Sequence, residues 1–551
     1  MFVHTLGFKE KLLVFALTAF GVGALLFWLG AIYMSVTKPL PASGGTYTEG
    51  VVGQPSYINP LLSQTSEADA DIANIIYSGL FSYDTQGQLK PNLADHYEVS
   101  EDGMTYTVTL KDNVKWHDGQ TLNAEDVAFT FNIVKDPAYK SPLRQNWQGV
   151  DVVADGDKTL VFTLKKPYFG FLENLTVGIL PKHIWENIAP EKFPLAEYNL
   201  SPVGSGPYQF YDFKKDSNGN ILTYEVRAFP EYFDKVPYIS KVIFHFYIDG
   251  DEMVDAYNRR EVMGVSNVVA EQEARLQDRK STRIAELHQP RLFAVFFNGI
   301  KSVALAHKEV RQALAYGTNR QEIIDQVLAG YGDPLSSPFL AQMKGFSSDE
   351  SVDIFDKDRA ASILENNGWV MKDGVREKGG SQLSFTLTTP DWPELVKTAD
   401  ILRKQWEDLG AKVDVRVLSV SDLQQNVLRP REYDALLFGE ATSFNSDPYS
   451  FWHSSQKHDP GLNLSLFDNK DADDLLATAR ETLGDDERLQ KYKQFRDILT
   501  EEMPAVFLYS PSYLYVVNSQ VQGIDVESIN MPSARLQNMP QWFIKTDRVL
   551  K

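Results

Sequence analysis

The chain has 551 residues, of which 43% are hydrophobic and 12% aromatic, so we expect a folded protein whose length requires at least two lobes. Fifty-four basic and 74 acidic residues give a formal net charge of -20, which argues against a nucleic-acid-binding surface because such surfaces need clustered Lys and Arg. The chain contains no cysteine, which excludes disulfide bonds, thiolate metal sites and cysteine nucleophiles within it.

The N-terminal segment contains an uncharged apolar run, residues 12–37, that follows Lys9 and Lys11. About 20 apolar residues span a bilayer, whereas a cleaved signal peptide usually has an apolar core of roughly 7 to 15 residues. We therefore predict a single anchor in the cell membrane. The alternative is cleavage near residues 41–43, which would leave an exported or periplasmic protein. Because the lysines precede the run, residues 1–11 are expected in the cytoplasm and the bulk of the chain outside it.

After the anchor we predict a linker that contains Pro, Gly and Ser over residues 38–45. Apolar residues then recur at helical spacing over residues 69–80. Asn123 is a candidate N-cap for a helix that follows it, because its amide oxygen can accept a hydrogen bond from the first helical turn. Strand-typical composition or alternation predicts strands over residues 46–52, 105–110 and 159–164.

The second half of the chain shows alternating strand and helix signals. Leu292–Phe297 is a short, aromatic-rich apolar run closed by an Asn298-Gly299 turn signal. We predict that this run is a buried strand along which the chain crosses from one lobe to another. A helical pattern follows from Leu305 to Val327. Later segments predict a β-α-β unit with a parallel crossover, a further strand and a returning crossing strand, at residues 383–389, 393–409, 413–417, 435–438 and 506–509.

Residues 76–131 carry turn, strand, turn and helix signals in one continuous order, IYSGLFSYDTQGQLKPNLADHYEVSEDGMTYTVTLKDNVKWHDGQTLNAEDVAFTF. This run closely resembles the family 5 extracellular solute-binding proteins, which are the peptide, dipeptide and nickel receptors of ABC importers. Further segments that resemble the family's motifs are Ser205–Tyr208, Arg227–Val236, Phe297–Arg320, Asp447-Pro448 and Glu501–Leu508. The resemblance covers nearly everything after about residue 45.

The resemblance implies an α/β fold of the two-lobed periplasmic-binding-protein type (type II), with an additional inserted domain and one preceding N-terminal transmembrane helix. The expected domains are lobe I over residues 46–290, with the inserted domain at about 62–185, lobe II over 291–503, and a return to lobe I over 504–551. It further implies a receptor and not an enzyme, which closes two lobes over a peptide and hands it to an ABC permease.

The expected partners are a small-molecule or peptide ligand, ABC permease subunits and the membrane, with no nucleic acid and with the protein itself a monomer. No cofactor is expected. The histidines contain no H-E-x-x-H or other close metal-ligand pair, so no metal site is predicted. Two alternatives remain open. One is an exported hydrolase whose two cleft carboxylates lie roughly 5 to 9 Å apart, and the other is a ligand-free sensor or scaffold of the same fold.

We place the ligand site between the lobes, where the strand ends of an α/β sheet open toward a crevice. Trp392 could stack on a ligand or anchor the core, Glu440 could pair with a cationic ligand or form a structural ion pair, and Asp447 could be a turn residue. The full candidate set is Asn298, Trp392, Glu440, Thr442, Ser443 and Asp447.

The chain departs from the family pattern at this site. Peptide-binding members typically show Gly-Trp followed closely by an aspartate that holds the free amine of the peptide. This chain has Glu440 where the tryptophan would be, and Ser443 near the position of the aspartate. The departure concerns peptide specificity and leaves solute binding as the expected function.

Overall fold

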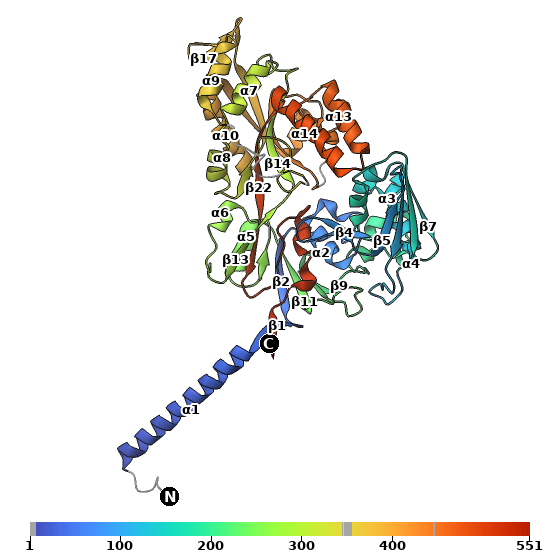
Figure 1. The fold of residues 1–551 in the computed structure, drawn as a ribbon, viewed down its shortest axis with the longest axis vertical. Helices are drawn as coiled ribbons and strands as arrows, with labels where there is room; N and C mark the ends of the chain where they lie inside the picture. Colours follow the sequence, from blue (N-terminus) through green and yellow to red (C-terminus); the bar gives the residue numbers. More distant parts are fainter. Residues whose placement is uncertain (1–6, 344, 347–354, 445–446, 551) are drawn as a thin grey trace.

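The computed structural model describes residues 7–343, 345–346, 355–444 and 447–550. Figure 1 shows a body of several lobes from which one long N-terminal helix projects, with the C-terminus beside the base of that helix. This helix, α1 (Phe8–Val36), is the only one within the described ranges that is long and apolar enough to cross a membrane.

Twelve strands of the described chain form one mixed sheet that runs through the body. They are β2 (Thr46–Val52), β9 (Tyr208–Lys215), β10 (Ile221–Ala228), β11 (Lys241–Tyr247), β12 (Gly264–Val265), β13 (Thr282–His288), β14 (Arg291–Phe297), β15 (Gly332–Pro334), β19 (Ser384–Pro390), β20 (Lys412–Leu418), β21 (Ala435–Ala441) and β22 (Ala505–Asn518). Their order is β20-β19-β21-β14-β22-β12-β2-β11-β10-β9, and β13 and β15 also pair with β22.

Strand β22 belongs to both halves of this sheet. Its first part pairs with β14, for example Val506 with Val295, and its second part pairs with β13, for example Tyr515 with Ala285. The chain also passes from β13 into β14 across Pro290. We call the half that contains β2 and β9–β13 lobe I, and the half that contains β14, β15 and β19–β21 lobe II. The lobes are therefore joined by two crossing segments that lie side by side (Figure 1).

Lobe II carries helices on both faces of its sheet. One layer consists of α7 (Lys308–Tyr316), α8 (Arg320–Val327), α9 (Lys357–Asn366) and α10 (Pro393–Glu407), and the other contains α13 (Lys470–Glu481) and α14 (Asp485–Glu502). Side chains alternate between the two faces of a strand, and helices cover both faces of β14. Every residue of the run is therefore buried, which explains why the run is apolar throughout. The two sets are Phe293, Val295 and Phe297 under the first layer, and Leu292, Ala294 and Phe296 under the second.

The helical pattern predicted from Leu305 to Val327 forms two helices instead of one. Gly317 ends α7, and a Cβ at this position would lie 2.2 Å from a methyl group of Leu409, so a larger residue here would force Leu409 to move. Asn319 then caps α8 by accepting a hydrogen bond from the Glu322 N–H at 3.0 Å. The apolar pattern thus contains one helix-stop signal, Gly317, and one helix-start signal, Asn319. These two signals divide the helix although the apolar periodicity continues through them.

A separate four-stranded antiparallel sheet, which we call the inserted domain, has the order β5 (Ala94–Val99), β6 (Thr105–Leu110), β8 (Thr159–Leu164), β7 (Val150–Asp155). Helix α3 (Ala124–Lys135) packs beside it, and Asn123 caps this helix as predicted. Strands β2, β6 and β8 also have the predicted bounds. Other elements are α2 (Glu67–Ile76), β3 (Phe81–Tyr83), β4 (Leu89–Pro91), α4 (Lys182–Trp185), α5 (Gly250–Asn258), α6 (Ala270–Glu273), β16 (Val370–Lys372), β17 (Val375–Lys378), β18 (Ser381–Gln382), α11 (Val420–Leu423) and α12 (Tyr449–Trp452).

The segment after α1 is a strand, although the sequence predicts a linker there. Strand β1 (Thr37–Ala42) pairs antiparallel with β23 (Lys545–Leu550), in a two-stranded sheet of their own. Pro39 and Pro41 occupy alternate positions of β1, so both can lie where the strand donates no ladder hydrogen bond. The partner strand comes from the other end of the chain, which is why local composition does not reveal the pairing.

Candidate functional site

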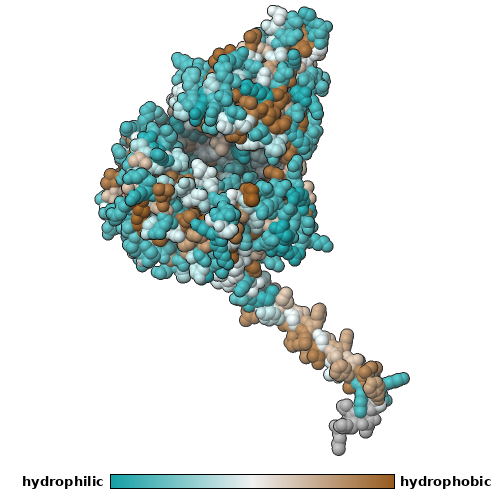
Figure 2. Space-filling view, turned by 180° about the vertical axis from the view of Figure 1, so that it is seen from behind, coloured by the Kyte–Doolittle hydropathy of each residue, from teal (hydrophilic) through white to brown (hydrophobic). Residues whose placement is uncertain are grey.

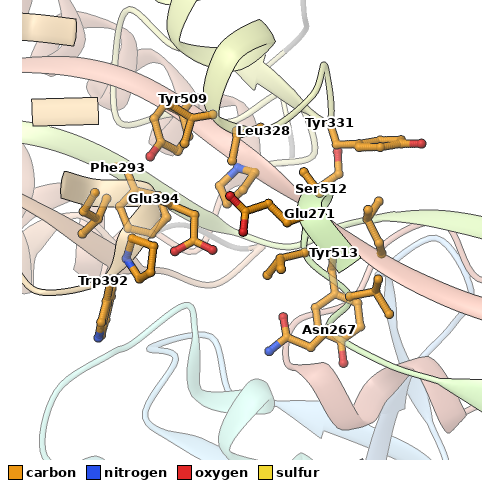
Figure 3. A pocket seen from close by; sticks show the side chains of 18 of the residues that line it. Asn267, Glu271, Phe293, Leu328, Tyr331, Trp392, Glu394, Tyr509, Ser512 and Tyr513 are labelled. Carbon is orange, nitrogen blue, oxygen red and sulfur yellow. The ribbon is translucent and has the colours of Figure 1, made fainter. Parts of the chain in front are cut away.

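A cavity of about 480 Å³ opens where the two crossing segments meet, and we call it the hinge pocket (Figure 3). Lobe I contributes residues 267–272, which are the loop before α6 and the start of α6, and lobe II contributes the end of α8 and the start of α10. The crossing segments add Arg291, Phe293, Tyr509 and Tyr513. A ligand in this pocket would contact both lobes at once, on opposite sides of the segments that join them.

Aromatic rings form much of the wall. Phe293 and Tyr509 lie opposite each other on β14 and β22, with ring centroids 5.3 Å apart. Gly439 of β21 makes room for Phe293, because a Cβ there would lie 2.8 Å from its ring. Trp392 is the N-cap residue of α10 and stacks on Phe438 at a centroid distance of 6.3 Å. The half-buried Trp392 ring is thus held in the pocket wall, where it can contact a ligand.

Charged groups of both signs share the hinge pocket. The carboxylates of Glu271, from lobe I, and Glu394, from lobe II, both point into it (Figure 3). Arg291 is the first residue of β14, and burial lowers the pKa of its guanidinium while Tyr509 and the carboxylates of Glu67 and Glu394 oppose this effect. Sequence reasoning missed Arg291. The signal in the sequence is a basic residue directly before the apolar run of residues 292–297.

Two further cavities, of about 770 and 590 Å³, lie near the loop that follows β21. The larger lies between the inserted domain and lobe II, and the smaller is also lined by α2 and by residues 530–533. Figure 2 shows from behind the recess between the upper lobe and the body below it. Thr442 and Ser443, in the loop after β21, line both of these outer cavities. The Thr442 N–H and Oγ1 donate to the Pro290 carbonyl at 2.7 and 3.2 Å, which fixes this loop to the crossing segment. Both candidate residues therefore face the space between the lobes.

Asp447 lines the larger outer cavity and already has a partner. Its Oδ2 accepts a hydrogen bond from Arg480 Nε at 2.7 Å, and Oδ1 accepts from the Tyr449 N–H at 3.3 Å. The Arg480 guanidinium also lies over the Tyr449 ring, 4.5 Å from its centroid. Asp447 thus has the turn role considered for it and a structural ion pair as well.

Asn298 lies away from these cavities. The residue is 1% exposed, and its Nδ2 donates to the Arg431 carbonyl at 3.0 Å. Its Oδ1 accepts from the N–H groups of Ile300 and Lys301 at 3.1 and 3.3 Å. The side chain closes the turn after β14, and we therefore leave it out of the site that we propose.

The prediction that the strand ends at Phe438 is wrong, and the correction changes the place of Glu440. Pairing with β14 extends β21 to Ala441, so Glu440 lies within the strand, opposite Leu292 and on the face away from the hinge pocket. Glu440 is 4% exposed, and neither carboxyl oxygen has a hydrogen-bond partner in the described chain. Burial raises the pKa of this carboxyl well above its usual range. Among the described residues, the structural ion pair considered for Glu440 does not form, and the side chain lines none of the three cavities described above.

Within the described ranges, no group of three or more His, Asp or Glu side chains is placed to hold a metal ion. Two lobes joined by two crossing segments, a cavity between them and an inserted domain define the mixed α/β fold of periplasmic binding proteins. In agreement with this class, the sequence model of the bacterial extracellular solute-binding proteins, family 5 (middle region), matches residues 88–462. The chain belongs to this family, whose members are binding proteins and not enzymes.

Several members of the family are similar to this chain over most of its length. The oligopeptide-binding protein AppA of Bacillus subtilis is 28% identical over 514 residues, which are 92% of each chain, and a structure of AppA contains a nonapeptide. The ABC transporter substrate-binding protein CtaP of Listeria monocytogenes has a TM-score of 0.79 at 28% identity, covering 91% of this chain and 99% of that one. NikZ of Campylobacter jejuni, solved with Ni(L-His), has a TM-score of 0.72 at 27% identity, covering 90% and 99%. The protein is an extracytoplasmic solute-binding protein of an ABC transporter.

Proposed function

We propose that this protein binds peptides between its lobes, closes over them by hinge motion and delivers them to the permease of an ABC importer. The observation that carries the proposal is the hinge pocket, whose wall comes from lobe I, lobe II and both crossing segments. A ligand that contacts both lobes stabilises the closed state over the open one, which is the requirement for ligand-driven closure. AppA, a relative of similar length, holds a peptide, and this supports peptides over nickel complexes as the first ligand class to test.

The inserted domain touches lobe II across the opening of the outer cavities. The Phe169 N–H donates to the Arg480 carbonyl at 3.4 Å, and the Phe169 ring lies 4.2 Å from the Arg488 guanidinium. Lys166 pairs with Glu481 at 3.3 Å nearby. Hinge motion would make and break these contacts. They therefore support a cycle in which the protein opens to admit a ligand and closes to retain it.

A thermal-shift screen of the full-length protein in detergent tests the proposal. The probes are peptide pools, nickel-histidine, free amino acids and sugars. A ligand that binds only the folded state adds about 2.7 kcal/mol of stability at a hundred times its dissociation constant, which is readily detected. We expect stabilisation by peptides that Trp392→Ala reduces and that Tyr211→Ala, an exposed control on β9, does not. Stabilisation by another class alone would contradict the peptide assignment and keep the receptor function.

We also propose that α1 is retained as the membrane anchor and that the receptor is monomeric. Pairing of β1 with β23 joins the base of α1 to the C-terminal strand, and Arg548 strengthens this junction. Its Nε donates to Thr37 Oγ1 at 2.9 Å, and its Nη2 donates to the Met34 carbonyl at 3.1 Å. Cleavage after Ala42 would remove all of β1 and leave β23 without its partner. The pairing therefore favours a mature protein that retains both β1 and the α1 anchor.

Mass spectrometry of the protein extracted from membranes tests the anchor. We expect a mass close to the 62.2 kDa of the full chain and no soluble fraction. A mature N-terminus at Ser43 would contradict retention. Sedimentation in detergent tests the monomer, since a dimer would double the protein mass.

A further inference from the structure

Arg291 carries a partly buried positive charge that has no partner within the described residues. No ion pair within 4.0 Å and no side-chain hydrogen bond joins its guanidinium to another group of that part of the chain. The guanidinium lies 4.8 Å from the centroid of the Phe293 ring, which stacks beneath it. Its position at the start of β14 directs it, with Phe293, toward the hinge pocket. An unpaired cation is thus displayed in a cavity of about 480 Å³.

The arginines that are fully buried show how the fold treats such a group. Arg535 pairs with Glu49 and Asp71 at 2.8 and 2.6 Å. Arg376 donates to the carbonyls of Leu409 and Trp369, both at 2.8 Å, and Arg431 donates to three backbone carbonyls. Burying a charge without a partner is costly, and these side chains avoid the cost. Arg291 differs because it faces open space, so an anion from outside can become its partner.

The surroundings of Arg291 indicate what kind of anion fits. The rings of Phe293, Tyr509 and Trp392 offer apolar surface beside the guanidinium. Glu271 and Glu394 face the same pocket and would hold a cationic group (Figure 3). A planar guanidinium matches a carboxylate in a two-point hydrogen bond. The volume lies within the range of roughly 300 to 1,000 Å³ that small-ligand pockets have.

We propose that Arg291 binds the carboxylate of the transported ligand, and that this ligand is a short peptide-like zwitterion whose ammonium group lies at Glu271 and Glu394. The inference rests on the receptor function proposed above and adds the ligand's charge pattern to it. The two glutamates come from opposite lobes, so closure would bring both carboxylates toward the same ammonium group.

The test compares three tripeptide libraries of the same sequences on the full-length protein in detergent. One has free termini, one has C-terminal amides and one has N-terminal acetyl groups. Binding is measured by thermal shift and native mass spectrometry on the wild type, Arg291→Gln, Arg291→Lys and Glu394→Gln. The matched control is Arg259→Gln, which removes an exposed arginine from lobe I that pairs with Glu261 at 2.7 Å.

We expect the free-termini library to bind the wild type and the control, and the amide library to bind at least tenfold more weakly. Arg291→Gln should lose roughly 30-fold or more in affinity for free carboxylates and none for amides, because removing one member of a desolvated charge pair has effects of this size. Arg291→Lys should fall between the two, since lysine keeps the charge without the planar fork. Without ligand, Arg291→Gln should unfold at the same temperature as the wild type or higher, which separates ligand binding from folding.

The possible results distinguish this inference from the proposed function. Equal binding of acids and amides would keep the peptide receptor and overturn the role of Arg291. Another result is that free amino acids stabilise the protein in a way that depends on Arg291, whereas peptides do not stabilise it. This result would keep the carboxylate subsite and overturn the peptide assignment. The subsite is overturned if no carboxylate-bearing probe stabilises the wild type more than Arg291→Gln. Undiminished binding of the acetylated library would overturn the role of the two glutamates.

Discussion

Glu440 provides a sharp test of the structural reasoning, because its carboxyl lies in the core of lobe II with no hydrogen-bond partner among the described residues. We expect Glu440→Leu to stabilise the protein. The side chain is 4% exposed, and both of its oxygens lack a partner in the described chain. Each buried, unsatisfied polar atom costs about 1 to 3 kcal/mol, so removal of the two should raise the free energy of unfolding by about 2 to 6 kcal/mol. Leucine also fits the face of β21 that packs with Leu292.

The pH dependence of this gain has a definite sign. Burial raises the pKa of Glu440 above the ordinary glutamate value of 4.5, so above that pH the folded state binds more protons at this site than the unfolded state does. Stability therefore falls as the pH rises from about 4.5 toward the raised folded-state pKa. Glu440→Leu removes this loss. The difference in stability between the variant and the wild type should consequently widen as the pH increases through this range.

Urea unfolding followed by tryptophan fluorescence, measured at several pH values, gives the free energies. The control is Glu432→Gln, because Glu432 is exposed and pairs with Lys301 at 2.7 Å, an arrangement worth at most about 1 kcal/mol. Ligand binding should survive in Glu440→Leu, since the side chain faces away from the hinge pocket. A destabilised Glu440→Leu variant with no dependence on pH would show that the carboxyl has a partner or is hydrated, and would refute the argument.

Two other predictions concern the body of the protein. Arg535→Gln should lower the free energy of unfolding by about 3 to 5 kcal/mol, because it leaves the buried carboxylates of Glu49 and Asp71 without their partner, and urea unfolding measures this loss. Phe169→Ala should weaken ligand binding roughly tenfold and enlarge the radius of gyration in X-ray scattering, because it removes a ring that joins the inserted domain to lobe II.

Each of these predictions has a control and a contradicting result. Arg259→Gln is the control for Arg535→Gln, and an equal, small effect of both would show that the buried cluster carries no net stability. Tyr211→Ala, on an exposed strand of lobe I, is the control for Phe169→Ala. An unchanged radius of gyration and affinity in Phe169→Ala would mean that this contact does not hold the lobes together.

Much of the local structure follows from the sequence because its causes are local. Asn123 caps α3, and the alternating runs at residues 105–110 and 159–164 form β6 and β8 with the predicted bounds. The order of such signals also identified the family, which the family match confirms. The predictions that failed did so for two different reasons. The helix from Leu305 ends at the local signals Gly317 and Asn319, which the apolar periodicity concealed, whereas the segment after α1 is a strand because the distant β23 pairs with it.

For the candidate site residues, too, the sequence indicated some positions but not the direction of every side chain. Sequence reasoning placed Trp392, Thr442 and Ser443 between the lobes, because they follow strand ends, and the structure has them in cavity walls. It could not orient Glu440, since the three additional residue pairs between β21 and β14, at residues 439–441, are what fix this side chain on the core face of the strand.

The sequence by itself determined the export segment, the α/β class and the family, because apolar length, periodicity and turn chemistry act within a few residues of the chain. Only the tertiary structure decided which charges have partners. Arg535 and Arg291 are equally cationic in sequence, yet one meets two carboxylates and the other faces an open pocket. The difference arises from segments more than two hundred residues apart, whose packing sets the local solvent and the neighbours of each charge.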